Sequence, residues 1–253
     1  MMPGDKRDII VVEDLVKRFG SFVANDHLNF RVSRGEIFGF LGANGAGKTT
    51  AIRILCGLSK PTSGKVLVAG QDVGTRPEKV KRSIGYMSQR FSLYEDLTVT
   101  ENIRFYAGIY GLGPALIRER TAALLHRLEL EHAADKLISS LPLGWKQKLA
   151  FSLAIFHEPA IVFLDEPTGG VDPVTRRQFW DLIYDAASKG ITVFVTTHYM
   201  DEAEYCDRVC IMVDGRIEAL GSPEELKARM GAADMDEVFV KLARKAIPRT
   251  EQV

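Results

Sequence analysis

Residues 42–49 decide the fold, and they read Gly42-Ala43-Asn44-Gly45-Ala46-Gly47-Lys48-Thr49. They fit the pattern G-x-x-x-x-G-K-[ST], in which glycines allow successive backbone N–H groups to surround phosphate oxygens. In such a loop Lys48 can reach the β- and γ-phosphates, and the Thr49 hydroxyl can bind Mg²⁺. The alternative is a glycine-rich turn with an exposed lysine. We favour a nucleotide-binding loop because of the segments on either side of it.

Those flanking segments have the patterns that a phosphate loop requires. Glu36–Leu41 is a nearly continuous apolar run, which indicates a strand buried on both faces. Lys48–Leu58 has a helical pattern, and its N-terminus would add the positive end of the helix dipole at the phosphates. Further strands are expected at Ile9–Leu15, Leu28–Val32, Lys65–Ala69, Ile84–Met87, Ile161–Leu164, Thr192–Thr196 and Arg208–Val213, with a helix at Val174–Ser188. This alternation predicts an α/β fold with a mostly parallel core sheet.

The middle of the chain has helical spacing and no convincing strand. Its expected helices are Glu101–Tyr110, Ala115–Leu130 and Lys146–Phe156. We therefore predict a single domain over residues 1–253, with a helical subdomain inserted at approximately 91–158. We also predict a C-terminal extension at approximately 223–253. Only Glu237–Ala243 has a clear helical period there, and the role of the extension stays open.

The composition bounds the class of protein. The chain has 253 residues, with 33 Lys+Arg against 33 Asp+Glu and 46% hydrophobic residues, which is typical of a globular protein. Zero net charge argues against a general nucleic-acid binder. The cysteines Cys56, Cys206 and Cys210 have neither disulfide nor zinc-site spacing, which fits a reducing cytosol. No signal peptide or bilayer-spanning run is readable, so we expect a cytosolic chain.

Two acids follow the apolar run Ile161–Leu164. In an open parallel sheet, ligands bind beyond the carboxyl ends of the strands, where the phosphate loop would also emerge. Asp165 suits a Mg²⁺ ligand, and Glu166 suits the general base that orients or deprotonates a water. The alternative is a helix-capping or turn acid, since Pro167 and Thr168 also have a turn pattern.

A histidine and a glutamine follow two other strands of the expected sheet. His198 comes after Thr192–Thr196 and could donate to a γ-phosphate or to charge that develops in the transition state. Gln89 comes after Ile84–Met87 and could reach Mg²⁺ or the water. A lone histidine is more often structural, and a solvated loop amide is the alternative for Gln89.

In this order the motifs resemble the nucleotide-binding subunit of ABC transporters, which are P-loop NTPases, over almost the whole chain. GANGAGKTT is similar to the Walker A loop, IVFLDEP to Walker B, Gly169-Gly170-Val171-Asp172 to the D-loop and TTHYMDEAE to the switch region. The resemblance implies an antiparallel N-terminal β part. It implies Glu166, His198 and Gln89 as catalytic residues, and Thr49, Gln89 and Asp165 as metal ligands. The implied nucleotide contacts are Phe19, Asn44, Gly45, Ala46, Gly47, Lys48, Thr49, Thr50, Gly144, Trp145 and Asp172.

Phe19 stands where the family stacks an aromatic side chain on adenine, although a core strand aromatic is a fair alternative. Within the family, GEIFGFLGANGAGKTT, SLYEDLTVTENIRFYAGIYGL and TTHYMDEAE resemble an ABC-2-type bacterial drug exporter. This implies ATP and Mg²⁺ as cofactors, and two ATPs between a pair of identical or different ATPase protomers. It also implies separate transmembrane permease subunits, a place on the cytoplasmic face of the inner membrane, and no nucleic-acid partner.

The signature motif departs from the family's usual Leu-Ser-Gly-Gly-Gln, because the residues here are Leu141-Pro142-Leu143-Gly144-Trp145. Pro142 offers neither a hydroxyl nor a backbone N–H, and Leu143 adds bulk where glycine would allow close approach. One interpretation is a degenerate site with slow turnover. We favour a subfamily variant in which backbone donors suffice, because the start of the following helix remains an anion site.

Arg90-Phe91-Ser92-Leu93-Tyr94-Glu95 is the candidate contact surface for membrane helices, with Phe91, Leu93 and Tyr94 as apolar anchors. The alternative is a loop packed on the protein's own helices. Rival functions are a soluble ABC ATPase of DNA repair or translation, and a P-loop kinase. The first is disfavoured by the single ATPase unit without heptads or charge runs, and the second by His198 and the signature segment.

Overall fold

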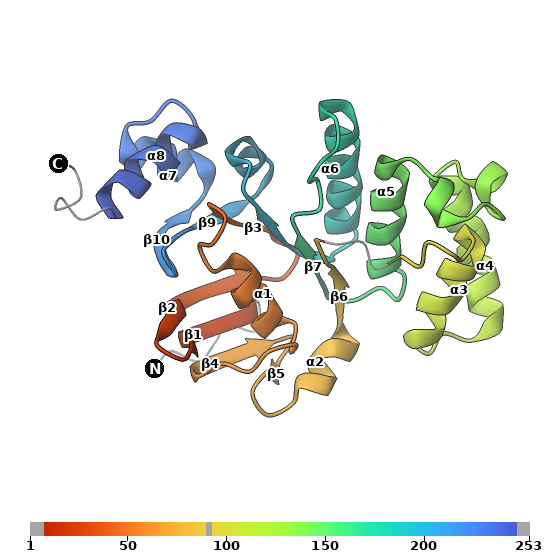
Figure 1. Cartoon of the computed structure of the whole chain (residues 1–253), viewed down its shortest axis with the longest axis horizontal. Coiled ribbons are helices and arrows are strands. Elements are labelled where there is room, and N and C mark those ends of the chain that lie inside the picture. Colours follow the sequence, from red (N-terminus) through yellow and green to blue (C-terminus); the bar gives the residue numbers. More distant parts are fainter. Residues whose placement is uncertain (1–7, 90–92, 247–253) are drawn as a thin grey trace.

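The computed structural model describes residues 8–89 and 93–246, and its centre is formed by two β-sheets (Figure 1). The first sheet has four strands in the order β2-β1-β4-β5. Its members are β1 (Asp8–Phe19), β2 (Phe22–Ser33), β4 (Ser63–Val68) and β5 (Gln71–Asp72). All three pairings are antiparallel, so the expected antiparallel N-terminal part is confirmed.

The second sheet has six strands in the order β10-β9-β3-β8-β7-β6. Its members are β3 (Ile37–Gly42), β6 (Ile84–Met87), β7 (Ile161–Asp165), β8 (Thr192–Thr197), β9 (Arg208–Val213) and β10 (Arg216–Gly221). Every pairing is parallel except that of β10 with β9. All residues of β3, β7 and β8 are buried, which explains the apolar runs Ile37–Leu41, Ile161–Leu164 and Val193–Val195 inside them. The predicted α/β fold with a mostly parallel core sheet is thus confirmed.

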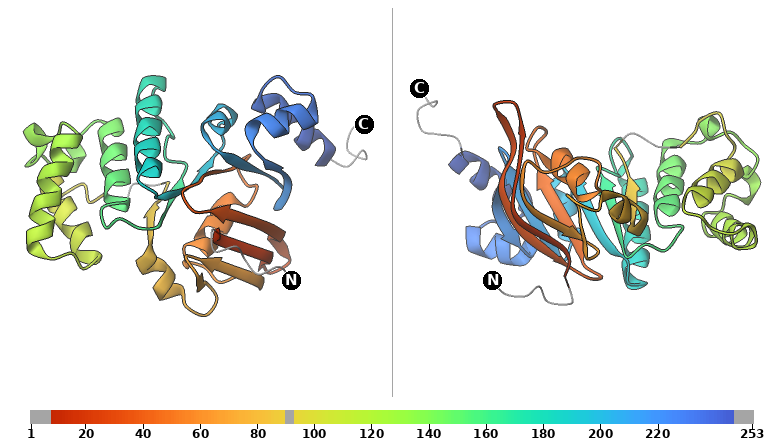
Figure 2. Two further views of the ribbon diagram at one scale, coloured as in Figure 1. Left: turned by 180° about the vertical axis from the view of Figure 1, so that it is seen from behind. Right: turned by 90° about the horizontal axis from the view of Figure 1, so that it is seen from below.

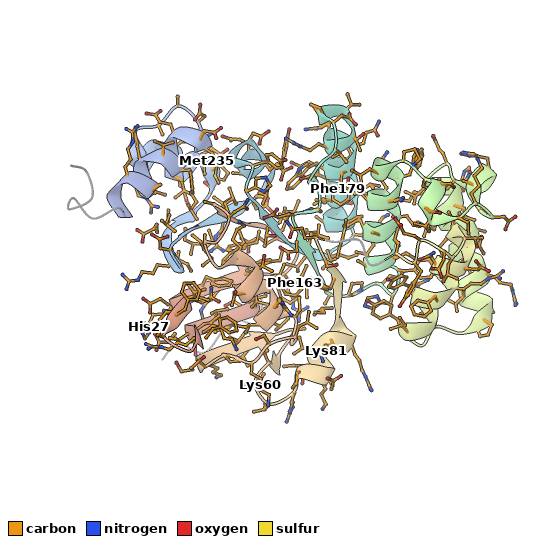
Figure 3. The ribbon with its side chains drawn as sticks, viewed as in Figure 1. His27, Lys60, Lys81, Phe163, Phe179 and Met235 are labelled. Atoms are coloured by element: carbon orange, nitrogen blue, oxygen red, sulfur yellow. The ribbon has the colours of Figure 1, made fainter. Side chains whose placement is uncertain are left out.

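Apolar side chains fill both faces of the parallel sheet. On one face Phe38, Phe40 and Phe194 lie against Phe30 of β2, with their ring centroids 5.5–6.3 Å from that of Phe30. On the other face the sheet packs on helices α5 (Leu143–Ala154) and α6 (Pro173–Ser188). The antiparallel sheet therefore lies on one face of the parallel sheet, with helix α1 (Lys48–Leu55) packed between the two, and α5 and α6 lie on the other face (Figure 2). Figure 3 places Phe163 and Phe179 inside this core, whereas Lys60 and Lys81 point outward.

Two groups of helices lie at opposite ends of the molecule (Figures 1 and 2). One end holds α3 (Val99–Ile109), α4 (Pro114–Arg127) and α5, in the region expected to be a helical subdomain. The other holds α7 (Pro223–Met230) and α8 (Met235–Ala246), which pack on each other and on strands β9 and β10. Within the described ranges, no helix is both long enough and apolar enough to span a bilayer. The predicted domain boundaries stay predictions.

Several short elements were not predicted from the sequence. They are β5, β10, α7, the helix α2 (Pro77–Ser83) and the 3₁₀ helices η1 (Glu131–Ala133), η2 (Ile138–Ser140) and η3 (Met200–Tyr205). Helix α1 (Lys48–Leu55) ends earlier than expected, because Gly57 has a positive φ of 71° that turns the chain out of the helix. Helix α5 starts earlier than expected, directly after Pro142, whose missing N–H is not needed at a helix start.

Candidate functional site

The loop between β3 and α1 has the backbone shape of a phosphate cradle. Gly47 has a φ of 96°, and a Cβ there would lie 2.3 Å from the carbonyl oxygen of Ala24, so only glycine fits without strain. The buried Asn25 of β2 donates from Nδ2 to the carbonyl oxygen of Gly47 at 3.1 Å. Asn44, Gly45 and Thr49 are exposed, whereas Ala46 is buried. The antiparallel sheet thus contacts the phosphate loop at Gly47 and leaves Asn44, Gly45 and Thr49 exposed.

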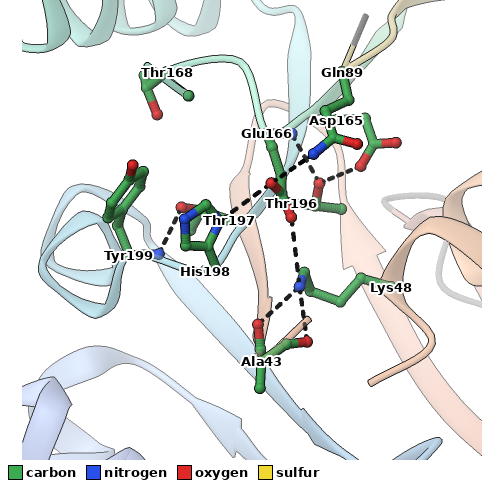
Figure 4. A network of polar contacts seen from close by, with 12 residues as sticks. Ala43, Lys48, Gln89, Asp165, Glu166, Thr168, Thr196, Thr197, His198 and Tyr199 are labelled. Atoms are coloured by element: carbon green, nitrogen blue, oxygen red, sulfur yellow. Dashed lines mark hydrogen bonds and ion pairs between the residues drawn. The ribbon is translucent and has the colours of Figure 1, made fainter. Parts of the chain in front are cut away.

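Lys48 lies between this loop and the end of β7 (Figure 4). Its ammonium donates to the carbonyl oxygens of Gly42 at 2.8 Å and Ala43 at 3.1 Å. It also lies 3.6 Å from Oε1 of Glu166. Burial lowers the pKa of Lys48, and the charge of Glu166 opposes that shift. The ammonium therefore joins the glycine-rich loop to the acidic pair.

Asp165 and Glu166 stand at the carboxyl end of β7, and both are held by Thr196 of β8. Thr196 donates from Oγ1 to Oδ1 of Asp165 at 2.7 Å and accepts from the backbone N–H of Glu166 at 3.0 Å. Burial raises the pKa of Asp165, and the hydrogen bond from Thr196 partly offsets this. Neither acid caps a helix, since the N-cap of α6 is Asp172. The capping alternative for this pair is therefore wrong.

The Glu166 carboxylate gathers side chains from three further elements (Figure 4). Its Oε2 accepts from Nε2 of Gln89 at 3.0 Å and contacts Nδ1 of His198 at 3.1 Å, while its Oε1 faces Lys48. Glu166 has a φ of 49°, a conformation that costs a non-glycine residue about 1–3 kcal/mol. The structure thus brings Lys48, Gln89, Glu166 and His198 together, and Gln89 and His198 are not isolated loop residues.

The oxygen donors at this edge suit a hard divalent cation. Thr49 presents its hydroxyl in the first turn of α1, Asp165 contributes a buried carboxylate, and Gln89 an amide oxygen. Mg²⁺ prefers oxygen ligands and is commonly bound by one or two carboxylates together with phosphates. Among the residues that the structure describes, no group of three or more His, Cys, Asp or Glu side chains could hold a metal ion. One carboxylate with a hydroxyl and an amide oxygen fits a cation to which phosphate oxygens supply further ligands.

A cavity of about 330 Å³ lies at the signature segment. Three of the predicted nucleotide contacts, Gly144, Trp145 and Asp172, line it together with Leu143 and Thr175. Asp172 caps α6 by accepting from the N–H groups of Val174 and Thr175. The hydrogen bond from the Thr175 hydroxyl, together with these backbone bonds, lowers the pKa of Asp172. A Cβ on Gly144 would lie 2.6 Å from Cγ2 of Thr175. The signature and D-loop segments are thus packed against each other. Gly144, Trp145 and Asp172 do not line the separate cavity that lies beside Glu166, whereas Gly169 of the D-loop does.

Phe19 ends β1 in the antiparallel sheet, where its ring is 56% exposed and lies 4.9 Å from the Lys17 ammonium. The alternative of a core aromatic is therefore wrong. Thr50 is half-buried in the first turn of α1.

The predicted contact segment is only partly described. Phe91 lies outside the described residues, as do Arg90 and Ser92. Leu93 is buried in the apolar core with helix α3, so its assignment as an apolar anchor for membrane helices is wrong. A leucine between polar neighbours packs inward whenever a helix offers it an apolar face. Tyr94 is 46% exposed and lies edge-on to Phe105 of α3 with ring centroids 4.7 Å apart.

Sequence reasoning missed three residues that hold the site. They are Asn25 behind the phosphate loop, Thr196 beneath the acidic pair, and Gln147 of α5, which donates to the carbonyl oxygen of Gly169 at 3.1 Å. Thr196 carried a usable signal, because a polar residue inside an apolar parallel strand needs a buried partner. Asn25 and Gln147 carried no signal, because their partners are backbone carbonyl oxygens far away in the sequence.

Comparison with known proteins agrees with this geometry. The family model described as ABC transporter matches residues 25–169. The chain is 47% identical over 245 residues to the probable multidrug ABC transporter ATP-binding protein YbhF of Escherichia coli (strain K12), covering 95% of this chain and 42% of YbhF. The chain therefore spans less than half the length of that relative.

A second curated relative matches over most of both chains. The chain is 37% identical over 232 residues to the Nod factor export ATP-binding protein I of Ralstonia nicotianae (strain ATCC BAA-1114 / GMI1000), covering 91% of this chain and 72% of that protein. Among solved structures, the dimeric ATP-binding cassette MJ0796 in a post-hydrolysis state with ADP and Pi superposes with a TM-score of 0.76. That match has 26% sequence identity and covers 84% of this chain and 98% of the cassette.

Proposed function

The chain belongs to the ABC transporter family of ATP-binding subunits, and from this premise we propose that it hydrolyses ATP to power export through separate membrane subunits. The observation that carries the proposal is the convergence of Lys48, Gln89 and His198 on the carboxylate of Glu166. Phosphoryl transfer to water requires a base, a positive charge that contacts the phosphates and polar groups that hold the attacking water. Glu166 is the base, Lys48 carries the positive charge, and Gln89 and His198 are the polar groups.

Each side chain has a role that follows from its position. Glu166 accepts hydrogen bonds and orients or deprotonates the attacking water, and His198 stabilises charge on the γ-phosphate. Lys48, now held by the carbonyl oxygens of Gly42 and Ala43, turns its ammonium to the phosphates. The backbone of Asn44–Gly47 and the hydroxyls of Thr49 and Thr50 surround the phosphates, and the exposed ring of Phe19 is offered to adenine.

Mg²⁺ would be held by Thr49, Asp165 and Gln89. When bound, it neutralises phosphate charge and so favours displacement of the leaving group. Thr196 keeps the Asp165 carboxylate in place through its 2.7 Å hydrogen bond.

Dimer closure completes the site in this proposal. The MJ0796 structure is dimeric with ADP and Pi bound, and this chain presents an open cavity that is lined by Gly144, Trp145 and Asp172 and not by its own Lys48. In a face-to-face dimer, the first turn of α5 would meet the phosphates of the nucleotide on the other protomer. The partner protomer is an identical or a different ATPase. Because Pro142 precedes that turn as the N-cap, the free N–H groups of α5 remain available as donors.

The permease partner is of the ABC-2 type in this proposal, and it places the chain at the cytoplasmic face of the inner membrane. Support comes from the similarity to YbhF and to the Nod factor export protein, and from the exposed ring pair of Tyr94, in the segment after Gln89, and Phe105 of α3. Closure of the dimer on ATP would then displace Tyr94 and Phe105, and with them the membrane subunit that they contact.

Purification of the chain from the membranes of cells that express it tests this function. We expect the chain to co-purify with a multi-span membrane protein, and the complex to release phosphate from ATP in the presence of Mg²⁺. A soluble ABC ATPase of DNA repair or translation would instead co-purify with nucleic acid or ribosomes. Hydrolysis without any membrane partner would favour that rival function.

A further inference from the structure

Gln147 of helix α5 is a buried polar side chain in the middle of the molecule, and it is only 1% exposed. Its Nε2 donates to the carbonyl oxygen of Gly169 at 3.1 Å, which assigns the orientation of the amide because a carbonyl can only accept. In the part of the chain that the structure describes, its Oε1 is buried without a hydrogen-bond partner. A buried amide oxygen without a partner costs about 1–3 kcal/mol, so a missing donor is expected beside it.

The place for that donor is a cavity of about 230 Å³ next to the acidic pair. Gln147 lines it together with Gln89, Glu166, Pro167 and Gly169. A water molecule occupies about 30 Å³ of liquid and needs two to four polar partners, so this cavity has the room and the groups for ordered water. Gln147 therefore faces the same small space as the carboxylate that is proposed to act as the base.

The segment Pro167–Gly170 is fixed from two sides. On one side the Thr168 hydroxyl donates to Oε1 of the buried Glu202 at 2.6 Å, which ties the segment to η3 behind His198. On the other side Gln147 holds Gly169 and ties the segment to α5. Because Glu166 directly precedes this segment and has a left-handed φ of 49°, its carboxylate direction depends on both attachments.

We propose that Gln147 is a positioning residue for ATP hydrolysis, linking the helix that begins with the signature segment to the backbone that aims Glu166. This inference rests on the proposed function. Gln147 sits one turn beyond Gly144 on α5, so a displacement of the first turn of α5 would be passed to Gly169 through one hydrogen bond. Its Oε1 accepts from a water in the cavity, which extends the link to the space between Gln89 and Glu166.

Two substitutions in the complex with the membrane subunits test the link. Gln147→Met keeps the length and volume of the side chain but removes donor and acceptor. Gln147→Glu keeps an acceptor toward the cavity but replaces the donor to Gly169. Ser152→Ala is the matched control, since Ser152 lies on the same helix, is 3% exposed with an unpartnered hydroxyl, and faces a different groove.

We expect both Gln147 variants to lower kcat by about tenfold or more while KM for ATP changes by less than about twofold, because small misplacements of a reacting group reduce the rate without weakening binding. Ser152→Ala should keep the kcat of the wild type. An unchanged kcat in the two Gln147 variants would overturn the inference and leave the proposed function intact. So would an equal fall in kcat for Ser152→Ala, because general loosening of α5 would then explain it. Absence of hydrolysis in the wild-type complex would overturn the proposed function and this inference with it.

If Gln147→Met does not fold, the kcat and KM of Gln147→Glu alone test the positioning role of Gln147. Thermal unfolding of each variant separates a loss of fold from a loss of position.

Discussion

The hydroxyl of Thr196 on β8 donates a 2.7 Å hydrogen bond to the carboxylate of Asp165 on the neighbouring strand β7. Both residues are almost fully buried, and the same hydroxyl accepts from the N–H of Glu166. One side chain therefore fixes the proposed metal ligand and the backbone of the proposed base.

Thr196→Val should raise the Mg²⁺ concentration that gives half-maximal ATP hydrolysis, because Asp165 loses the group that fixes its orientation. It should also lower the free energy of unfolding by about 1–3 kcal/mol, since it leaves the buried Oδ1 acceptor of Asp165 unpaired, whereas the N–H of Glu166 keeps its bond to the carbonyl oxygen of Thr196. Mg²⁺ titrations of the hydrolysis rate check the first part, and urea denaturation the second.

Thr192→Val is the control for this effect. Thr192 is equally buried at the other end of β8, where its hydroxyl accepts from the N–H of Gly35 at 2.9 Å. It should destabilise the protein without changing the Mg²⁺ dependence. An identical Mg²⁺ curve for Thr196→Val and the wild type would refute the role of Thr196.

Gly144→Ala should slow ATP hydrolysis by about tenfold, because the new methyl group meets Cγ2 of Thr175 at 2.6 Å and displaces the signature segment from the D-loop. Adding Thr175→Ser should restore most of the rate, since serine lacks Cγ2 but keeps the hydroxyl that binds Asp172. Steady-state hydrolysis rates of the two single variants and the double variant measure this coupling.

Gly108→Ala in helix α3 is the control for the glycine change itself. A Cβ there meets nothing within 4 Å, so this variant should keep its activity and gain about 0.5–1 kcal/mol of stability. If Gly144→Ala hydrolyses ATP as fast as the wild type, the close packing of Gly144 on Thr175 has no part in turnover.

Pro142→Ser should leave the hydrolysis rate of the assembled transporter within about twofold of the wild type while raising its melting temperature. The first turn of α5 already has free N–H groups after Pro142, and serine is the better N-cap by about 1 kcal/mol. A large gain in rate would show instead that the natural signature segment is degenerate.

His157 should make the protein less stable at acidic pH. Its ring stacks on Tyr110 with centroids 3.5 Å apart, and burial lowers its pKa, with the charge of Arg120 acting in the same direction. The unfolded state therefore binds the proton more readily than the folded state. This contribution is fully present above the ordinary pKa of about 6.5 and is lost as the pH falls through that value toward the lower folded pKa.

Urea denaturation between pH 5 and 8 measures this effect. His157→Phe keeps a ring against Tyr110 and should flatten the pH dependence, whereas a change at the exposed His132, such as His132→Gln, should leave it as in the wild type. An unchanged slope in His157→Phe would contradict the assignment to His157.

The sequence predicted the strands that carry the site because parallel strands buried on both faces have unbroken apolar runs. It also predicted that Lys48, Gln89, Glu166 and His198 meet, because each follows or begins an element at the carboxyl edge of one sheet. The strand β10 was missed because only one of its residues is buried and the strand lacks a clear alternation of apolar and polar residues. Gln147 was missed because its partner Gly169 lies 22 residues away and binds through its backbone. Leu93 was misplaced because burial of a loop residue depends on tertiary packing.

The central claim is that Glu166 drives ATP hydrolysis, and phosphate release by the transporter complex carrying Glu166→Gln tests it most directly. The amide keeps the size of the side chain but cannot act as a base, so we predict that ATP still binds while multiple turnover falls by at least about 100-fold. Glu158→Gln, at an exposed carboxylate paired with Arg120, should keep the wild-type rate. Multiple turnover at the wild-type rate by Glu166→Gln would contradict the claim.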